Sequence, residues 1–210
     1  MQTEHADPVQ YFLEDVDQNR LCINNWINRS LRLHFLGTIR CVYCGRKTKK
    51  SFSQGYCYPC FRSCPETAEC IIFPERCLAH EEKGRDPNWE KEHHHQPHIV
   101  YLSYTSGIKV GVTRQTQAVT RWIDQGAVEA VPICVVPYRQ LAGEIEVFMK
   151  EKYTDKTNWQ RMLKNEILQG VDLLEEREEN AELMDQANLG EYISDSEDII
   201  SINYPVLEYP

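Results

Sequence analysis

The sequence lacks an apolar run long enough to cross a bilayer, and it lacks the pattern of a signal peptide. Its longest apolar stretch is AVPICVVP, residues 130–137, far short of the roughly 20 residues that a membrane-spanning helix needs. The opening stretch, MQTEHADPVQ, contains neither a basic region nor an apolar core. These absences predict a cytoplasmic protein without a membrane partner.

Acidic residues are missing from residues 18–65. The same stretch holds nine cationic side chains, namely Arg20, Arg29, Arg32, Arg40, Arg46, Lys47, Lys49, Lys50 and Arg62. Residues 171–210 show the opposite, with twelve acidic residues and one arginine. This split predicts a basic face for a polyanion and an acidic tail that can dock a protein partner, so the net charge of −9 does not exclude nucleic acid. The alternative is a solvated surface on which charges cluster by chance.

The nine cysteines indicate metal binding, because thiols in the cytosol stay reduced and do not form a disulfide framework. CVYC and CYPC place Cys41, Cys44, Cys57 and Cys60 in two C-x2-C pairs. A lone pair of this kind can be a redox dithiol, whereas two pairs at this spacing are typical of a structural four-thiolate zinc site. The sequence therefore predicts a zinc ribbon.

A second group of thiols and imidazoles follows the ribbon. It comprises Cys64, Cys70, Cys77, His80, the run His93 to His95, and His98. The spacing is irregular and offers more ligands than one ion needs, so it predicts a second zinc without fixing its ligands.

Cations and aromatic rings alternate between the two cysteine pairs. Cations attract phosphates and rings can stack on bases, which indicates nucleic-acid binding. The predicted binding residues are Arg46, Lys47, Lys49, Lys50 and Tyr56. Alternatively, the aromatic side chains cover the zinc and the lysines only keep the loop soluble.

The pattern in the second half changes to short strands and helices. Residues 99–104 and 108–113 predict two strands joined by a Thr-Ser-Gly turn, and Gly111 within the second marks a place where something approaches the backbone closely. A helix over residues 115–126, a buried strand over 128–137 and a helix over 138–153 follow. Asp155 and Thr157 are candidate caps of a last helix. Residues 18–40, which alternate over short runs such as SLRLHFLG, predict a small β-unit that leads into the ribbon.

This order resembles the GIY-YIG nuclease fold over about residues 98–165. VYL, centred on Tyr101, and KVG, which ends at Gly111, stand where that family has its two tripeptides. The resemblance implies catalytic roles for Tyr101, Lys109, Arg121, Glu146 and Asn158. Two departures are that Lys109 replaces the second tyrosine and that the first glycine is absent. Helical periodicity does not separate Glu144 from Glu146, and the resemblance alone selects Glu146.

The longer runs TRWIDQGA and DKTNWQRMLKN, with the ribbon, resemble bacterial proteins of unknown function that join a zinc ribbon to a GIY-YIG-like domain. That resemblance implies Cys70, Cys77, His80 and His94 as ligands of the second zinc, with Cys64 as the substitute. Relatives of this kind continue into another small β-domain, so this chain can be a truncated form.

The expected fold class is α+β. A β-unit (1–40) and a zinc-binding region (41–97) lead into a GIY-YIG-like domain with a small antiparallel sheet flanked by helices (98–170). An acidic helix and tail (171–210), partly disordered, end the chain. The expected function is a metal-dependent endonuclease that uses Mg²⁺ or Mn²⁺ and acts on DNA in preference to RNA. Tyr101 would activate or orient water with its pKa lowered by Lys109, Arg121 would hold the phosphoryl oxygens, Glu146 would hold the metal ion, and Gly111 would admit the substrate backbone. The alternatives are a non-catalytic nucleic-acid-binding adaptor and a zinc-stabilised protein-interaction module.

Overall fold

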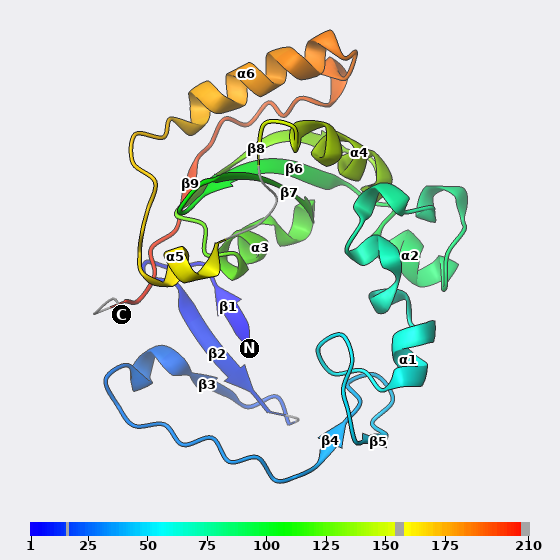
Figure 1. Cartoon of the computed structure of the whole chain (residues 1–210), viewed down its shortest axis with the longest axis vertical. Helices are drawn as coiled ribbons and strands as arrows, with labels where there is room; N and C mark the ends of the chain where they lie inside the picture. The colour runs from blue at the N-terminus through cyan, green and yellow to red at the C-terminus, as the bar shows by residue number, and fades with distance from the viewer. Residues whose placement is uncertain (16, 154–157, 207–210) are drawn as a thin grey trace.

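The computed structural model describes residues 1–15, 17–153 and 158–206. Its centre is an antiparallel sheet in the order β7-β6-β8-β9 (Figure 1), formed by Ile108–Arg114, His98–Tyr104, Glu129–Val136 and Ile200–Ser201. The register sets Tyr101 of β6 opposite Gly111 of β7 and Ser103 opposite Lys109. The first three strands are rich in β-branched residues that fit a half-buried pleated surface, as the sequence predicts.

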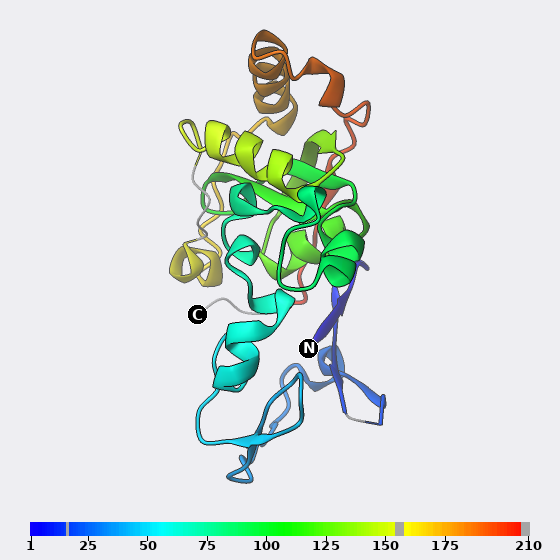
Figure 2. The ribbon, with the colours of Figure 1, turned by 90° about the vertical axis from the view of Figure 1, so that its right-hand side faces the viewer.

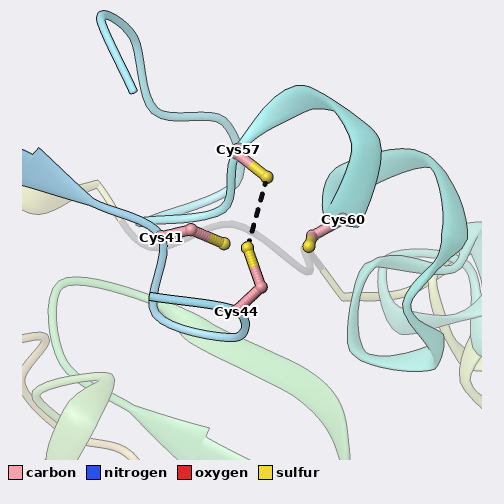
Figure 3. Close-up of side chains that lie close together, drawn as sticks. All are labelled: Cys41, Cys44, Cys57 and Cys60. Carbon is pink, nitrogen blue, oxygen red and sulfur yellow. Dashed lines mark hydrogen bonds between the residues drawn. The ribbon is translucent and has the colours of Figure 1, made fainter. Parts of the chain in front are cut away.

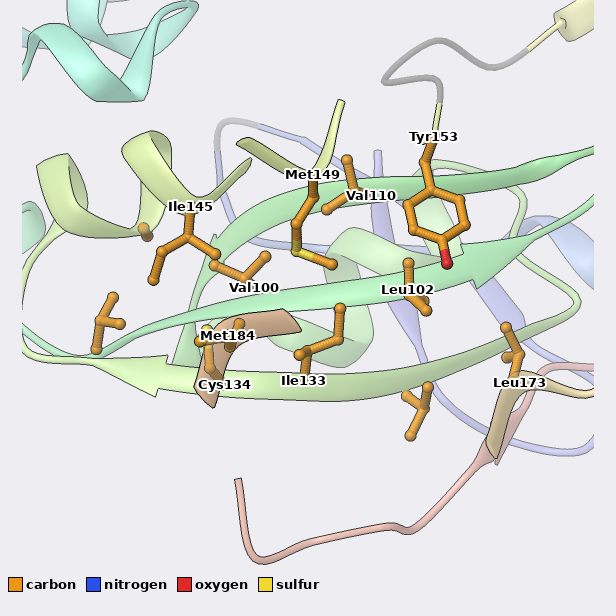
Figure 4. Packing of buried hydrophobic residues seen from close by; sticks show 13 residues of the cluster. Val100, Leu102, Val110, Ile133, Cys134, Ile145, Met149, Tyr153, Leu173 and Met184 are labelled. Carbon is orange, nitrogen blue, oxygen red and sulfur yellow. The ribbon is translucent and has the colours of Figure 1, made fainter. Parts of the chain in front are cut away.

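The two faces of this sheet carry different helices. Val100 and Leu102 pack beneath α4 (Arg139–Met149) and α6 (Leu173–Gln186), in the cluster that Figure 4 shows. Ile99 and Tyr101 belong to the opposite cluster, with Trp122 and Ile123 of α3 (Ala118–Asp124). Alternate residues of one strand therefore anchor helices on both faces.

The chain begins with a small three-stranded sheet, β1 (Gln2–Glu4), β2 (Gln10–Glu14) and β3 (Arg20–Cys22). The 3₁₀ turn η1 (Ile23–Trp26) follows. Val9 is fully buried against the α3 side of the large sheet, and its N–H donates to the Asn203 carbonyl over 2.8 Å. Residues 30–38, by contrast, form neither helix nor strand, although their alternation predicts a strand.

The zinc-binding region is built from very short elements. β4 (Ile39–Arg40) pairs with β5 (Lys47–Thr48), and α1 (Tyr58–Ser63) follows. Four 3₁₀ turns come next, η2 (Pro65–Thr67), η3 (Glu69–Ile71), η4 (Pro74–Arg76) and η5 (Ala79–Glu81), and then α2 (Pro87–His93), capped by Asp86. Figure 2 shows β4, β5 and α1 extending away from the large sheet, whereas η4 packs against α4.

The last short helix is α5 (Trp159–Leu163), and Asn158 caps it by accepting a hydrogen bond from the Arg161 N–H over 3.2 Å. The expected caps Asp155 and Thr157 lie outside the described residues. Two further 3₁₀ turns are η6 (Gln115–Gln117), just before α3, and η7 (Gly190–Tyr192), after α6.

The acidic segment is part of the folded body up to residue 206, where the sequence predicts partial disorder. Leu173 and Met184 of α6 are buried in the core, and Arg177 donates to the carbonyls of Pro132 and Ser194. Most acidic side chains of α6 lie on its outer face. Because they are so numerous, the apolar face of the helix is difficult to recognise in the sequence.

The structure confirms a mixed α+β chain with small antiparallel sheets and several helices. Over the ranges 1–15, 17–153 and 158–206, none of the helices is both long and apolar enough to cross a membrane.

Candidate functional site: two metal clusters and a buried tyrosine

The first metal cluster is the set of four cysteines predicted from the paired spacing. The sulfur atoms of Cys41, Cys44, Cys57 and Cys60 lie within 4.8 Å of one another and point toward a common centre (Figure 3). Cys57 sits at the N-terminus of α1, which carries Cys60, while a tight turn ending at Gly45 presents the other pair. A four-thiolate set of this kind can hold a structural zinc ion.

Two thiols of this cluster differ in pKa: burial raises the pKa of Cys60, whereas that of Cys41 is lowered. Burial raises the pKa of Cys41, but hydrogen bonds from the backbone N–H groups of Cys44 and Cys57 outweigh it and lower the pKa to about 6. The thiolate is the form that binds zinc.

The second metal cluster contains three of its four predicted ligands. Cys70, Cys77 and His94 are buried, with their ligand atoms within 4.8 Å of one another. The Nδ1 atom of His94 lies 3.5 Å from the Cys77 sulfur and 3.9 Å from that of Cys70. Hydrogen bonds from Cys70 and His94 lower the pKa of Cys77 to about 4 despite burial, so this group too can hold zinc.

The fourth predicted ligand, His80, lies outside this group. Its ring stacks on Tyr138 with the centroids 4.4 Å apart, and its Nδ1 atom is buried with no hydrogen-bond partner among the described residues. His80 follows Cys77 by three residues in the chain, so its buried nitrogen stays a candidate for the fourth ligand. The substitute Cys64 is placed elsewhere, because it packs with Cys41, Cys57 and Cys60 of the first cluster.

Arg139 joins the second metal cluster to α4. Its guanidinium donates to the carbonyls of Cys70 and Ile71, each over 3.0 Å, and its N–H donates to the His94 carbonyl over 2.9 Å. Gly143, one turn further along α4, lies so close to η4 that a Cβ there would stand 2.2 Å from the Glu75 nitrogen. The segment that carries the second metal cluster therefore packs directly against α4, and the sequence does not predict this contact.

Tyr101 fills the space beside Gly111 in which the sequence predicts an approaching substrate. Its ring leans across the sheet onto Gly111, where a Cβ would lie 2.6 Å from the phenol oxygen. The glycine is thus explained by the tyrosine on the neighbouring strand rather than by an approaching ligand backbone. Tyr101 is fully buried, and its hydroxyl donates to the Gln125 side-chain oxygen over 2.7 Å.

Arg121 of α3 and Glu146 of α4 both act on the pKa of this phenol. Burial raises the pKa of Tyr101 to about 12, the charge and hydrogen bond of Arg121 oppose that rise, and the charge of Glu146 adds to it. The three residues selected by the resemblance are therefore electrostatically coupled around one hydroxyl. Arg121 is exposed, so the group opens to solvent on its side.

Glu146, rather than Glu144, belongs to this group. Glu146 is 8% exposed, whereas Glu144 points to solvent. The Glu146 carboxylate also accepts a hydrogen bond from Lys150 Nζ over 3.3 Å. The candidate metal-binding carboxylate therefore has an ion-pair partner in Lys150, one turn further along α4.

Lys109 is buried close to Arg121. Burial, with the charge of Arg121, lowers the pKa of Lys109 to about 8. The expectation that Lys109 lowers the pKa of Tyr101 is not met, because Arg121 is the cation with the largest effect on that phenol.

Asn158 is exposed, and its side-chain oxygen caps α5. This capping hydrogen bond is a structural role for the Asn158 side chain.

The predicted nucleic-acid-binding cations all lie on the surface of the ribbon. Arg46, Lys47, Lys49 and Lys50 are exposed, and Lys50 Nζ stands 5.3 Å from the centre of the Phe52 ring. Tyr56 is instead half-buried against the first metal cluster, as the covering role predicts. The rings that face solvent are Tyr43 and Tyr58, which are 60% and 53% exposed.

A sequence model of the family described as "Protein of unknown function (DUF2797)" matches residues 28–210. No curated protein and no solved structure matches the chain.

Proposed function

The chain belongs to the DUF2797 family, and we propose its function from its own residues, since the function of the family is unknown. The protein is a metal-dependent endonuclease that hydrolyses phosphodiester bonds in DNA. The zinc ribbon brings the substrate to the site. The observation that supports this proposal is that the charges of Arg121 and Glu146, from two separate helices, both act on the pKa of the Tyr101 phenol.

Each of the three groups has a part in the reaction. Arg121 is exposed and presents a guanidinium that can hold two phosphoryl oxygens at once. Tyr101 keeps its proton near neutral pH, because burial raises its pKa to about 12, so it orients the attacking water rather than serving as its base.

Lys109 is mostly protonated near neutral pH, because its pKa is about 8. Its ammonium, buried close to Arg121, would add positive potential that stabilises the negative charge of the phosphoryl group.

Glu146 fits a hard divalent cation, because Mg²⁺ in such sites is held by one or two carboxylates, by waters and by the substrate phosphate. A bound Mg²⁺ or Mn²⁺ would neutralise charge on the phosphoryl group and its leaving oxygen. The Lys150 ammonium lies 3.3 Å from the Glu146 carboxylate and would have to share it with the metal ion.

The test is incubation of the zinc-loaded protein with plasmid, single-stranded and branched DNA in the presence of Mg²⁺ or Mn²⁺. We expect cleavage by the natural sequence and by Glu144→Gln, and its loss in Glu146→Gln. The two glutamates lie on the same helix but differ in burial, so they form a matched pair. Cleavage that is equal in both variants contradicts the proposal.

A non-catalytic nucleic-acid-binding adaptor is the second candidate. Two observations favour it: Tyr101 is fully buried, and Glu146 already has an ion-pair partner in Lys150. Salt-dependent DNA binding without turnover under any metal condition would select the adaptor. Absence of binding even at low salt would select a zinc-stabilised protein-interaction module.

A further inference from the structure

The segment that leads into the ribbon leaves large apolar side chains in water. Leu33, Phe35 and Leu36 are 81%, 70% and 84% exposed, and the chain there is neither helix nor strand. No backbone hydrogen bond joins residues 30–38 to another backbone group of the described chain. Figure 1 shows this stretch as a long arc between η1 and β4. Apolar groups exposed in such a run mark a surface that a partner covers.

The positive charge along this segment favours an anionic partner. Arg29, Arg32 and Arg40 are exposed and interleave with the apolar residues. The ribbon continues the pattern with its exposed lysines and with Tyr43 and Tyr58. No acidic residue occurs between Asp17 and Glu66, so the whole surface is complementary to a polyanion.

We propose that residues 29–40, together with the exposed face of the ribbon, bind single-stranded DNA. A duplex offers phosphates to the cations, but it hides its base faces and leaves the leucine and phenylalanine side chains uncovered. A single strand offers both phosphates and base faces, which stack on aromatic rings and cover apolar groups. This inference rests on the proposed function and narrows its substrate to DNA with a single-stranded portion.

The experiment compares binding of two labelled probes by fluorescence anisotropy at one ionic strength. The probes are an oligothymidine and a mixed-sequence duplex, and the protein is the full zinc-loaded chain. We expect the oligothymidine to bind more tightly. Phe35→Ala should weaken its binding about five-fold or more, the loss of one stacked base, and leave duplex binding unchanged.

Leu33→Ser and Leu183→Ser form a matched pair of controls. Both remove an exposed leucine, but Leu183 lies on α6, among acidic residues. Leu33→Ser should weaken oligothymidine binding, and Leu183→Ser should not. Both variants are expected to fold, since neither leucine is buried.

Three results overturn the inference. Equal binding of both probes with no effect of Phe35→Ala overturns it, while DNA cleavage, if retained, leaves the proposed function intact. A dimer in solution that Leu33→Ser dissociates assigns the segment to self-association instead. Failure to bind either probe, together with absence of cleavage, removes both the inference and the proposed function.

Discussion

Tyr101 and Gly111 face each other across two neighbouring strands, and the phenol of one fills the space above the other. A Cβ at position 111 would lie 2.6 Å from the phenol oxygen and 2.7 Å from the ring carbon that bears it. Since these are the far atoms of a buried, hydrogen-bonded ring, any side chain at 111 must displace the hydroxyl. The glycine therefore fixes where the phenol lies relative to Arg121.

Gly111→Ala should consequently destabilise the protein by about 1–3 kcal/mol, the usual cost of overpacking, and reduce cleavage strongly. Gly107→Ala is the control, because nothing lies within 4 Å of a Cβ there. Thermal unfolding and plasmid cleavage should be measured on both. If Gly111→Ala behaves as Gly107→Ala does, the packing of Tyr101 over the glycine is wrong.

Elemental analysis should find two zinc ions per chain, one for each cluster of thiols and imidazoles. Cys41→Ser and Cys77→Ser should each lose one ion, because each removes a ligand from a different cluster. Cys22→Ser should retain both, since Cys22 lies in β3, away from either group. An iron–sulfur absorption spectrum would contradict the zinc assignment.

His80→Ala tests the fourth ligand of the second metal cluster. It should weaken retention of one zinc against a chelator without affecting the other, because Cys70, Cys77 and His94 still supply three ligands. Competition with a chromogenic chelator measures this. His95→Ala, which changes an exposed histidine of the same region, is the control. Equal retention in both variants removes His80 from the site.

Lys109→Met should change how the stability of the protein depends on pH, because the variant has no titrating group at this position. The pKa of Lys109 is about 8 in the folded state, below the ordinary value of 10.5. Between these pH values the unfolded state binds more protons, so the stability of the natural protein should rise with pH relative to that of the variant. Thermal unfolding of both proteins at pH 7 and at pH 9.5 measures the difference. An equal change with pH in both proteins contradicts the lowered pKa of Lys109.

The sequence predicts the local parts of this molecule well. Two C-x2-C pairs place four sulfur atoms together because each knuckle is a tight local turn, and the structure brings Cys41, Cys44, Cys57 and Cys60 into one group. Gly126, the last residue of the helix predicted over 115–126, has a φ of +67° just beyond α3, a conformation that favours glycine.

The parts that depend on distant packing could not be predicted from the sequence. Three consecutive histidines are equivalent in the sequence, but the end of α2 buries His94, stacks His93 on Trp89 and exposes His95. Arg139 looks like an ordinary first residue of a helix, yet it holds carbonyls 68 and 69 positions earlier in the chain.

Two segments, residues 30–36 and α6, differ from what their sequence predicts, and solvent exposure accounts for both differences. The alternation of residues 30–36 is that of a strand, but a strand needs a partner and the described chain offers none there. In α6 the acidic residues conceal a buried face whose anchor is Arg177, the one cation of that region.

The most direct test of the central claim is a double-variant comparison of Arg121→Ala and Glu146→Gln. Single-turnover cleavage of a DNA substrate with Mg²⁺ should be measured for the natural protein, both single variants and the double variant. If both groups act on one phosphodiester, each single change should slow cleavage by about a hundred-fold or more, and the double variant should be little slower than the worse single variant. Cleavage that survives both substitutions unchanged contradicts the account.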